Sequence, residues 1–385
     1  MLDYLGLEEE FTHEERTARD TAREFADDAR EEMVESYREG QFPVERIPEM
    51  GDLGFYAPNL DGYGLAGTTD RAYGLVMQEL EACDSGLRSM ASVQGALVIY
   101  PIHRFGSESQ RERFLPELAT GDLVGCFGLT EPEHGSNPAG METSATRDDE
   151  GYRLNGSKRW ITNAPIADLA LVWARTKNGD GPVRGFLVET DRDGVTTGHI
   201  DGKLSMRAMS SGRLRLDDAR VPEENVLPGV EGMKGPLSCL TQARYGIAWG
   251  AVGAARDCFE TALAYTSDRD QFGGPIARFQ LQQEKLAEMA TQITLGQLLA
   301  NRLAELKQAD ELRPEQVSMA KRNNVRMARN QARVAREMLG GNGITLEYSP
   351  MRHMANMETV YTYEGTHDIH TLILGNDLTG IGAFE

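Results

Sequence analysis

The sequence predicts an α+β protein, mainly helical, with a helical domain at each end and a β-domain between them. Helical periodicity covers residues 8–120 and returns after Pro236. Between them lie short, partly alternating apolar segments bounded by Gly, Asn, Asp and Pro, which are typical of strands and turns. No helical stretch separates these strands, which excludes a βαβ array. We therefore predict an N-terminal helical domain at 1–120, a middle β-domain at 121–232 and a C-terminal four-helix bundle at 233–385.

The first domain is expected to contain four helical stretches. A charged, periodic stretch covers Glu8–Glu39, and Ala72–Cys83 follows a turn-rich loop at 59–69. Ala91–Phe105 is apolar enough for a buried helix, and Glu108–Thr120 is short and amphipathic.

The other two domains follow from the same rules. Strands are predicted at 123–129, 152–154, 169–174, 185–188 and 213–216. Apolar stripes at helical spacing occupy 243–263, 286–306 and 317–338, and a short apolar helix follows Glu364. Four helices are enough for a bundle.

Composition excludes several classes of function. The net charge is -20, which argues against a nucleic acid or an anionic membrane as partner. No apolar run is long enough to span a bilayer, and the acidic start lacks the basic residues of a targeting peptide, so we expect a cytoplasmic protein without membrane insertion. Of 40 basic residues only seven are lysines, and this acidic, arginine-rich balance resembles proteins that work in high salt; a merely acidic protein is the alternative.

Three patterns are interpreted as structural. The four cysteines form no Cys-x-x-Cys pair and are expected to be reduced core residues: Cys83, Cys126, Cys239 and Cys258. The run Gly62–Gly67 fits a dinucleotide-binding pattern but lacks a preceding strand and a βαβ unit, so we interpret it as a loop. His367 and His370 lack a third ligand at suitable spacing, so no metal site is predicted.

Chemistry is expected around Glu364. This carboxylate lies between Tyr363 and Gly365, just before a helix that Thr366 can cap, and is well placed to act as a general base; the stretch taken alone favours a solvated turn, and the other motifs change that interpretation. The loop Cys126–Asn137 offers backbone donors and hydroxyls that suit a flat polar ring and a phosphate. Segments 160–163 and 269–273 add an aromatic face and a guanidinium suited to a pyrophosphate.

Together, these motifs resemble the acyl-CoA dehydrogenase family. Five of them occur in that family's order, at Leu129–Ser136, Trp160–Asn163, Asp268–Gly273, Leu339–Gly343 and Tyr363–Thr366. Within the family, the stretches 84–89, 242–250 and 364–370 are most similar to the glutaryl-CoA dehydrogenases. Asn137 and Asn376 depart from the family pattern, which has Asp and Arg there.

The resemblance implies FAD as cofactor and Glu364 as the base that removes the α-proton of the acyl thioester. Most of the implied flavin contacts come from the middle domain and the start of the last helix: Phe127, Gly128, Leu129, Thr130, Ser136, Trp160, Ile161, Thr162, Thr366, His367 and Asp368. A second group is implied to reach the pyrophosphate and adenine of a flavin held mainly by a neighbouring subunit: Arg269, Phe272, Gln280, Glu337, Met338, Leu339, Gly340 and Gly341. A homo-oligomer, usually a tetramer in this family, follows from that sharing.

The resemblance also implies an acyl-CoA substrate. Gly365 would lie beside the thioester, and the CoA channel would be lined by Ser136, Leu237, Ser238, Cys239, Leu240, Thr241, Gln242, Ala243 and Arg244. Arg88, with Glu81 and Ser89, matches the set that binds the far carboxylate of glutaryl-CoA; a surface arginine paired with Glu81 or Asp84 is the alternative.

The implied reaction is dehydrogenation of glutaryl-CoA with decarboxylation to crotonyl-CoA and CO2, a step of lysine and tryptophan degradation, with electrons passed to an electron-transfer flavoprotein. Four alternatives stay open: a short-chain dehydrogenase for another acyl group, a glutaryl-CoA dehydrogenase that retains the carboxylate, an oxidase, and a non-catalytic CoA-binding module.

Overall fold

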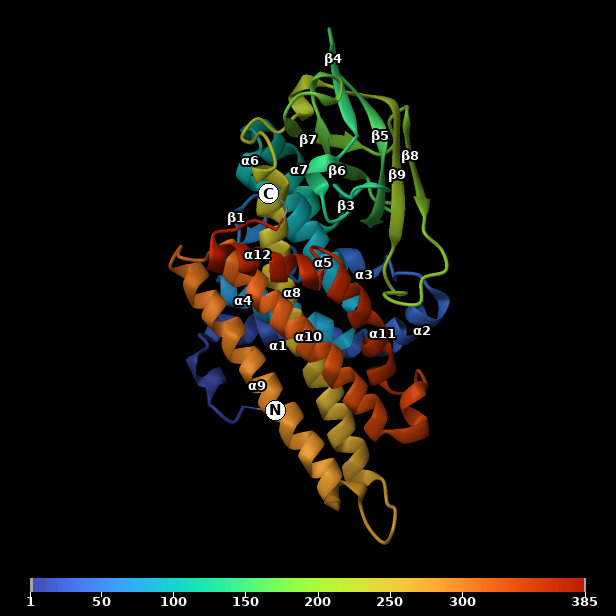
Figure 1. The fold of residues 1–385 in the computed structure, drawn as a ribbon. Coiled ribbons are helices and arrows are strands. Elements are labelled where there is room, and N and C mark those ends of the chain that lie inside the picture. The colour runs from blue at the N-terminus through green and yellow to red at the C-terminus, as the bar shows by residue number, and fades with distance from the viewer. Residues whose placement is uncertain (1–2, 384–385) are drawn as a thin grey trace.

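Helices at both ends of the chain flank a sheet-forming middle part in the computed structural model, which describes residues 3–383 (Figure 1). This confirms the predicted class and order. Seven α-helices precede the sheet: α1 (His13–Asp28), α2 (Arg30–Glu39), α3 (Arg46–Asp52), α4 (Asp70–Cys83), α5 (Ser85–Ser92), α6 (Tyr100–Phe105) and α7 (Glu108–Thr120).

The structure differs from the predicted helices of this part in three places. The stretch expected at Glu8–Glu39 is divided into a 3-10 turn, α1 and α2, because the chain bends at Ala29. The stretch expected at Ala91–Phe105 contains the end of α5, a π-helical segment (Val93–Ile99) and α6. The loop expected at 59–69 contains a short hairpin of β1 (Asp61–Gly62) and β2 (Leu65–Ala66).

The middle part is one seven-stranded sheet. Its strands are β3 (Gly125–Gly128), β4 (Ser144–Asp148), β5 (Gly151–Thr162), β6 (Leu169–Arg175), β7 (Val183–Glu189), β8 (Val195–His199) and β9 (Ser211–Val221). The order is β3-β6-β4-β5-β9-β8, with β7 paired to β6, and β3 runs parallel to β6. We did not predict β4 or β8; β8 is short, only partly buried and rich in Thr and Gly, so it lacks a clear alternation.

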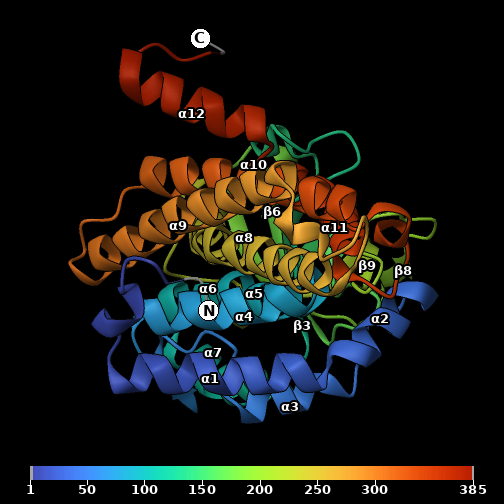
Figure 2. The same cartoon turned by 90° about the horizontal axis from the view of Figure 1, so that it is seen from below.

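The last part contains three long helices and two shorter ones. They are α8 (Lys234–Asp268), α9 (Gln280–Gln308), α10 (Pro314–Met338), α11 (Ser349–Thr362) and α12 (His367–Thr379). The three long helices coincide with the predicted apolar stripes. We did not predict α11, which follows the glycine-rich turn at 340–344. Figure 2 shows α12 projecting from the other helices, and among its described residues only His370 is buried.

Helix α4 lies at the centre of the helical layers, between α1 and α8 (Figure 2). Every residue from Arg71 to Cys83 is buried, so α4 is covered on all sides. The α4–α8 contact is close because α8 presents glycine: a Cβ added at Gly253 would lie 1.9 Å from the carbonyl oxygen of Gln78. The elements on both sides of this contact carry the polar residues of the site described below.

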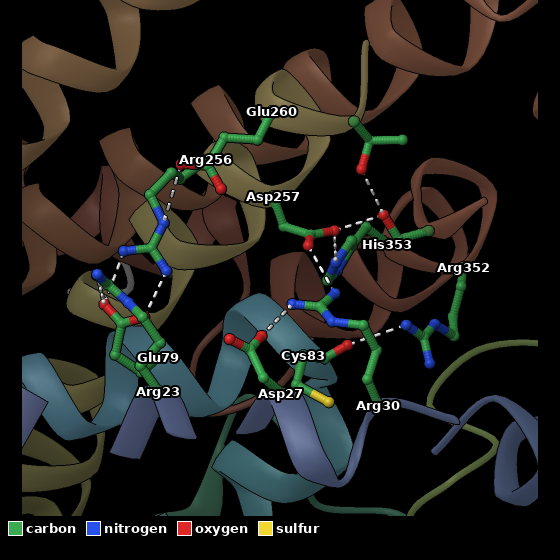
Figure 3. A network of polar contacts seen from close by, with 12 residues as sticks. Arg23, Asp27, Arg30, Glu79, Cys83, Arg256, Asp257, Glu260, Arg352 and His353 are labelled. Carbon is green, nitrogen blue, oxygen red and sulfur yellow. Dashed lines mark hydrogen bonds and ion pairs between the residues drawn. The ribbon is translucent and has the colours of Figure 1, made fainter. Parts of the chain in front are cut away.

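Charged side chains connect these layers through a buried network (Figure 3). Glu79 of α4 accepts from Arg23 of α1 at 3.0 Å and from Arg256 of α8 at 2.7 Å. Next to it, Asp257 of α8 accepts from Arg30 of α2 at 2.7 Å and lies 3.1 Å from Nε2 of His353 on α11. The network therefore links the N-terminal helices to α11, the helix that precedes the turn of Glu364.

Candidate active site

The backbone between α11 and α12 turns Glu364 inward. Glu364 has φ +51°, a conformation that non-glycine residues seldom adopt, and Gly365 has φ +95°. A Cβ at Gly365 would lie 2.9 Å from Nε2 of His370 and 3.1 Å from Nη2 of Arg244, so the turn needs glycine. Thr366 caps α12 by accepting the backbone N–H of Ile369 at 3.1 Å, as predicted.

The Glu364 carboxyl group is buried among cations. Its Oε2 is buried and has no hydrogen-bond partner among the described residues. Burial raises the pKa of Glu364, and the charges of Arg88, Lys321 and Arg244 oppose that rise. A desolvated carboxylate with raised proton affinity is a stronger base than one in water. The geometry therefore excludes the solvated turn.

A second polar cluster lies beside it, where α4 ends and α5 begins. Arg88 of α5 is fully buried and donates to the carboxylate of Glu81 on α4 and to the hydroxyl of Tyr363. Its Nη1 has no partner among the described residues, and the hydroxyls of Ser89 and Ser92 are likewise buried and unpaired. Arg88 is thus no surface arginine: it presents a free N–H edge next to two hydroxyl groups.

A narrow cleft lies between the segment 57–60, α4, the π-helical segment, α6 and the start of α8. It is lined by Ala57, Asn59, Leu60, Tyr73, Gly95, Ala96, Tyr100 and Gln242. Tyr73 connects the cleft to the polar cluster, because it lines the cleft and lies near Ser92 and Arg88. Its hydroxyl is buried without a partner among the described residues, and burial is the main cause of its raised pKa. Gln242 is one of the residues predicted to line the CoA channel.

The rest of that predicted channel lies on the first turns of α8. Leu237 and Thr241 face solvent, whereas Cys239 and Ala243 are buried in the core. Arg244 is buried and donates through Nε to the carbonyl oxygen of Glu364 at 2.7 Å. Ser136 lies exposed on the loop after β3.

The predicted flavin residues of the middle domain meet at one end of the sheet. Phe127 and Gly128 belong to the buried strand β3, and the backbone N–H of Arg159 donates to the carbonyl oxygen of Thr130 at 2.9 Å. Trp160 is the extra residue of a β-bulge in the β5–β9 pair; it has φ +60° and its side chain is 56% exposed. The bulge turns the indole out of the sheet beside Thr130, so these residues offer a flat apolar face next to polar groups.

A buried lysine fixes the loop that follows β3. Lys158 of β5 donates to the carbonyl oxygen of Leu129 at 3.1 Å and to the carboxylate of Glu131 at 2.8 Å. Glu131 also accepts the backbone N–H groups of residues 142–143 at 2.7 and 3.0 Å. The loop is therefore fixed both to β5 and to residues 142–143. A rigid loop with backbone donors and hydroxyl groups fits the flavin that the motifs imply.

The other predicted flavin residues lie far from Glu364 in this chain. Arg269, Phe272 and Gln280 are exposed at the loop between α8 and α9, at the opposite end of α8 from the sheet (Figure 1). Glu337, Met338, Leu339, Gly340 and Gly341 lie at the end of α10. Arg244 and Arg269 are 25 positions apart along α8, or about 37 Å at 1.5 Å per residue. Within one chain, the flavin residues of the middle domain and those at the far end of the bundle therefore do not lie at a single site.

We did not predict Ser92, Tyr73 or Lys321 as members of the site. Ser92 follows Arg88 by four positions on α5, and this spacing alone would have placed both on one helix face. Tyr363 belongs to the Tyr363–Thr366 motif, but its contact with Arg88 depends on tertiary structure and was not predicted. Lys321 lies on the buried face of α10, within its apolar stripe. Helical periodicity predicts that this position is buried, but it does not explain why a lysine occupies it.

Comparison with known proteins places this geometry in context. Three family models match the chain: "Acyl-CoA dehydrogenase, N-terminal domain" at residues 12–122, the middle domain at 126–219 and the C-terminal domain at 231–379. The short-chain specific acyl-CoA dehydrogenase of Bos taurus mitochondria is 32% identical over 97% of this chain and 92% of its own length.

Two crystal structures of glutaryl-CoA dehydrogenase from Mycobacterium smegmatis are also similar. One is 51% identical with a TM-score of 0.97, and the other, in complex with FADH2, is 49% identical with the same TM-score. Each covers 100% of this chain and 99% of the crystallised chain.

Proposed function

Because the chain belongs to the acyl-CoA dehydrogenase family and is an FAD-dependent acyl-CoA dehydrogenase, we propose that its substrate is glutaryl-CoA, with Glu364 as the base. One observation carries the choice of acyl group. Arg88 is fully buried near Glu364, and its Nη1 and the hydroxyls of Ser89 and Ser92 have no partners among residues 3–383. A carboxylate at the end of a short acyl chain satisfies these donors, whereas a methyl group leaves them unpaired.

The charges of the site also support a substrate whose acyl chain ends in a carboxylate. Arg88 is paired with Glu81, so this pair alone is neutral, and Tyr363 adds a neutral hydroxyl. Lys321 and Arg244 add positive charge around the single carboxylate of Glu364. When Lys321 is protonated, the described cluster therefore has one net positive charge, which a substrate carboxylate neutralises.

Glu364 takes the α-proton in this proposal. Bound acyl-CoA excludes water from the carboxyl group and raises its proton affinity further. FAD, when bound, accepts the β-hydride, and the exposed face of Trp160 with the polar groups of Thr130 and Thr162 can hold it at the edge of the sheet. Glu364 on its left-handed turn faces the acyl chain from the bundle side.

Decarboxylation follows from the chemistry of the product. Loss of the α-proton and β-hydride converts glutaryl-CoA to glutaconyl-CoA, whose carboxylate is attached to the γ-carbon next to the α,β-double bond, so electrons released at that carbon can delocalise through the double bond into the thioester. The C–C bond to that carboxylate breaks, CO2 leaves, and the electron pair stays on the dienolate. Glu364 returns its proton to the γ-carbon, which gives crotonyl-CoA.

The first prediction compares two substrates. Arg88→Met should lower kcat/KM for glutaryl-CoA by about 100-fold, because a hydrogen bond to a charged group contributes about 1.5–3 kcal/mol. The same change should affect butyryl-CoA much less, since its acyl chain has no carboxylate. The holoenzyme is assayed with an artificial electron acceptor, and the acyl-CoA product is identified by mass spectrometry.

A double variant controls for the buried partner. Arg88→Met leaves Glu81 buried and unpaired, which alone can disturb the site. Glu81→Gln combined with Arg88→Met removes both charges, and it should still discriminate against glutaryl-CoA. Equal losses on both substrates in the double variant would contradict the proposed acyl group. Glutaconyl-CoA as the final wild-type product would contradict the decarboxylation step alone.

A short-chain dehydrogenase for an unsubstituted acyl group is the second candidate. The 32% identity with the bovine short-chain enzyme favours it. Under that function, wild-type protein oxidises butyryl-CoA with a higher kcat/KM than glutaryl-CoA. The substrate comparison above therefore decides between the two.

Two partners complete the proposal. The family resemblance supports an electron-transfer flavoprotein as the acceptor of electrons. The distance of about 37 Å between Arg244 and Arg269 supports a homo-oligomer, in which the exposed α8–α9 loop of one subunit contacts the flavin of another.

A further inference from the structure

Three consecutive carbonyl groups at the α11–α12 junction each accept a hydrogen bond from a buried cation. Nζ of Lys321 lies 2.8 Å from the carbonyl oxygen of Tyr363 and 2.7 Å from that of Gly365. Nε of Arg244 lies 2.7 Å from the carbonyl oxygen between them, that of Glu364. The two cations come from α10 and α8, so two bundle helices hold the turn that carries the proposed base.

Ion pairing does not explain why Lys321 is buried. Lys321 is 1% exposed, and no carboxylate lies within salt-bridge distance of it among the described residues. Other lysines do have such partners: Lys158 pairs with Glu131, and Lys307 pairs with Asp70. A buried ammonium group costs several kcal/mol to desolvate, and here two backbone carbonyls of one turn are its hydrogen-bond partners.

The turn that Lys321 holds is strained. Glu364 has φ +51°, and a non-glycine residue in the left-handed region costs roughly 1–2 kcal/mol. Such a conformation persists only where surrounding contacts determine it. The same ammonium group lies 5.9 Å from the ring centroid of Tyr363, whose hydroxyl contacts Arg88. Lys321 thus contacts both residues that flank Glu364.

We propose that Lys321 is a positioning residue for the base: it holds the Glu364 turn through the carbonyl groups of Tyr363 and Gly365, and its positive charge opposes protonation of the Glu364 carboxyl group. This inference rests on the proposed role of Glu364. Lys321 itself touches neither the acyl chain nor the flavin in this scheme.

The charges around Lys321 agree with such a role. Burial lowers the pKa of Lys321 to about 7; the carboxylate of Glu364 opposes this decrease, and Arg244 and Arg88 add to it. Conversely, Lys321 is one of three cations that oppose the rise in the pKa of Glu364. The remaining groups that face it are neutral Tyr363 and the imidazoles of His367 and His370, whose pKa values it helps to lower.

The variant Lys321→Met distinguishes a role in positioning the base from a role in the stability of the fold. It removes the charge and both hydrogen bonds but keeps the length and apolar stem of the side chain. We expect wild-type FAD content, a small change in KM and a decrease in kcat of about 10–100-fold, because a small displacement of a catalytic group can cost about 100-fold. The acidic limb of the kcat/KM–pH profile should move up by about one pH unit, because loss of a nearby positive charge disfavours the carboxylate.

Two further variants assign these effects. Lys321→Gln keeps one donor without the charge, so kcat should recover in part while the acidic limb stays at its shifted position. Lys321→Arg keeps the charge, so the limb should return toward its wild-type position. Lys307→Met, which removes a half-buried lysine of α9 paired with Asp70, is the matched control and should leave the limb unchanged.

Exchange of the α-protons with solvent, measured without oxidation of the acyl chain, tests the proposed base separately from the flavin. 3,3-Dimethylbutyryl-CoA has α-protons but no β-hydrogen, so the holoenzyme can exchange its α-protons with D2O but cannot oxidise it. Mass spectrometry should show slower exchange in Lys321→Met than in wild type at each pH from 6 to 8.

The outcomes distinguish the two levels of the proposal. Exchange that survives Glu364→Gln, or a wild type that oxidises no acyl-CoA, would overturn the proposed function. Wild-type exchange rates and an unshifted acidic limb in Lys321→Met would overturn the role of Lys321 and leave the proposed function intact. If Lys321→Met does not fold, an unshifted limb in Lys321→Gln has the same meaning.

Discussion

At the scale of single residues, the proposed site depends on the carboxyl group of Glu364, which is buried. Burial raises the pKa of Glu364, while Arg88, Lys321 and Arg244 limit the rise. A general base, the role proposed for Glu364, must bind a proton during the reaction and must be free of it beforehand. The three cations favour the ionised form, because they oppose the rise in the pKa without forming a hydrogen bond to Oε2 of Glu364.

This balance predicts a pH dependence. Glu364 acts only when deprotonated, so kcat/KM should fall as pH decreases through its pKa, which lies above the ordinary value for glutamate. Glu364→Gln should retain FAD and bind glutaryl-CoA but lose about 10²–10⁴-fold in kcat. Steady-state assays and flavin absorbance measure both. Residual activity with the wild-type acidic limb would assign the base to another group.

Residues with a defining neighbour in the chain could be predicted from the sequence, and those defined by tertiary contacts could not. Glu364 precedes a glycine and a helix cap, which the sequence shows, and the role of Arg88 was implied by the resemblance of the stretch 84–89 to the glutaryl-CoA dehydrogenases. Lys321 is 42 positions from Tyr363, and no local pattern indicates that its ammonium group reaches that carbonyl oxygen. The positioning contacts of the site are therefore the part that the sequence leaves undetermined.

At the scale of elements, the long amphipathic helices were predictable because their apolar stripes persist over many turns. The β-bulge at Trp160 was not, because the extra residue depends on how β5 pairs with β9. The motif indicated an aromatic face, and the bulge accounts for the left-handed backbone, φ +60°, that Trp160 adopts within the strand. Strand β8 was missed for the opposite reason: it has little alternation to detect.

The charged network between the helices predicts sensitivity to acid (Figure 3). Hydrogen bonds and charges from His353, Arg30 and Ser349 lower the pKa of Asp257 despite its burial. A carboxyl group with a lowered pKa in the folded state stabilises the protein above its unfolded pKa of about 4, and this contribution is lost as pH falls below that value. Asp257→Asn should therefore destabilise the protein at pH 7 and make a smaller difference at pH 3.

Urea unfolding of wild type and Asp257→Asn at both pH values measures this difference. Glu79, whose pKa is also lowered in the network, titrates in both proteins and so cancels in the comparison. A difference in unfolding free energy that is equal at pH 7 and pH 3 would show that the charge of Asp257 does not stabilise the helices.

At the scale of the whole molecule, the order of the three parts could be predicted, while their mutual placement could not. Nothing in the sequence shows that the sheet order is β3-β6-β4-β5-β9-β8, or that α4 is enclosed between α1 and α8. The resemblance did imply two groups of flavin residues, and the structure places those groups at opposite ends of α8.

This separation predicts that FAD retention depends on assembly. Arg269→Ala should weaken FAD binding although Arg269 lies about 37 Å from Arg244, because its guanidinium would contact the flavin of a neighbouring subunit. Flavin released on dilution, followed by fluorescence, measures this affinity, and light scattering gives the oligomeric state. A wild-type monomer that retains FAD, or an Arg269→Ala protein with unchanged affinity, would contradict a shared site.

Helix α8 has a further consequence, for how such a chain can change during evolution. Each residue added to an α-helix turns everything beyond it by about 100° and advances it by 1.5 Å. An insertion or deletion between Arg244 and Arg269 would therefore rotate one end of α8 relative to the other, and would misalign either the proposed acyl channel or the loop proposed to contact the next subunit. Length variation is better tolerated in the loops, so new acyl specificity along this helix has to arise by substitution within a fixed length.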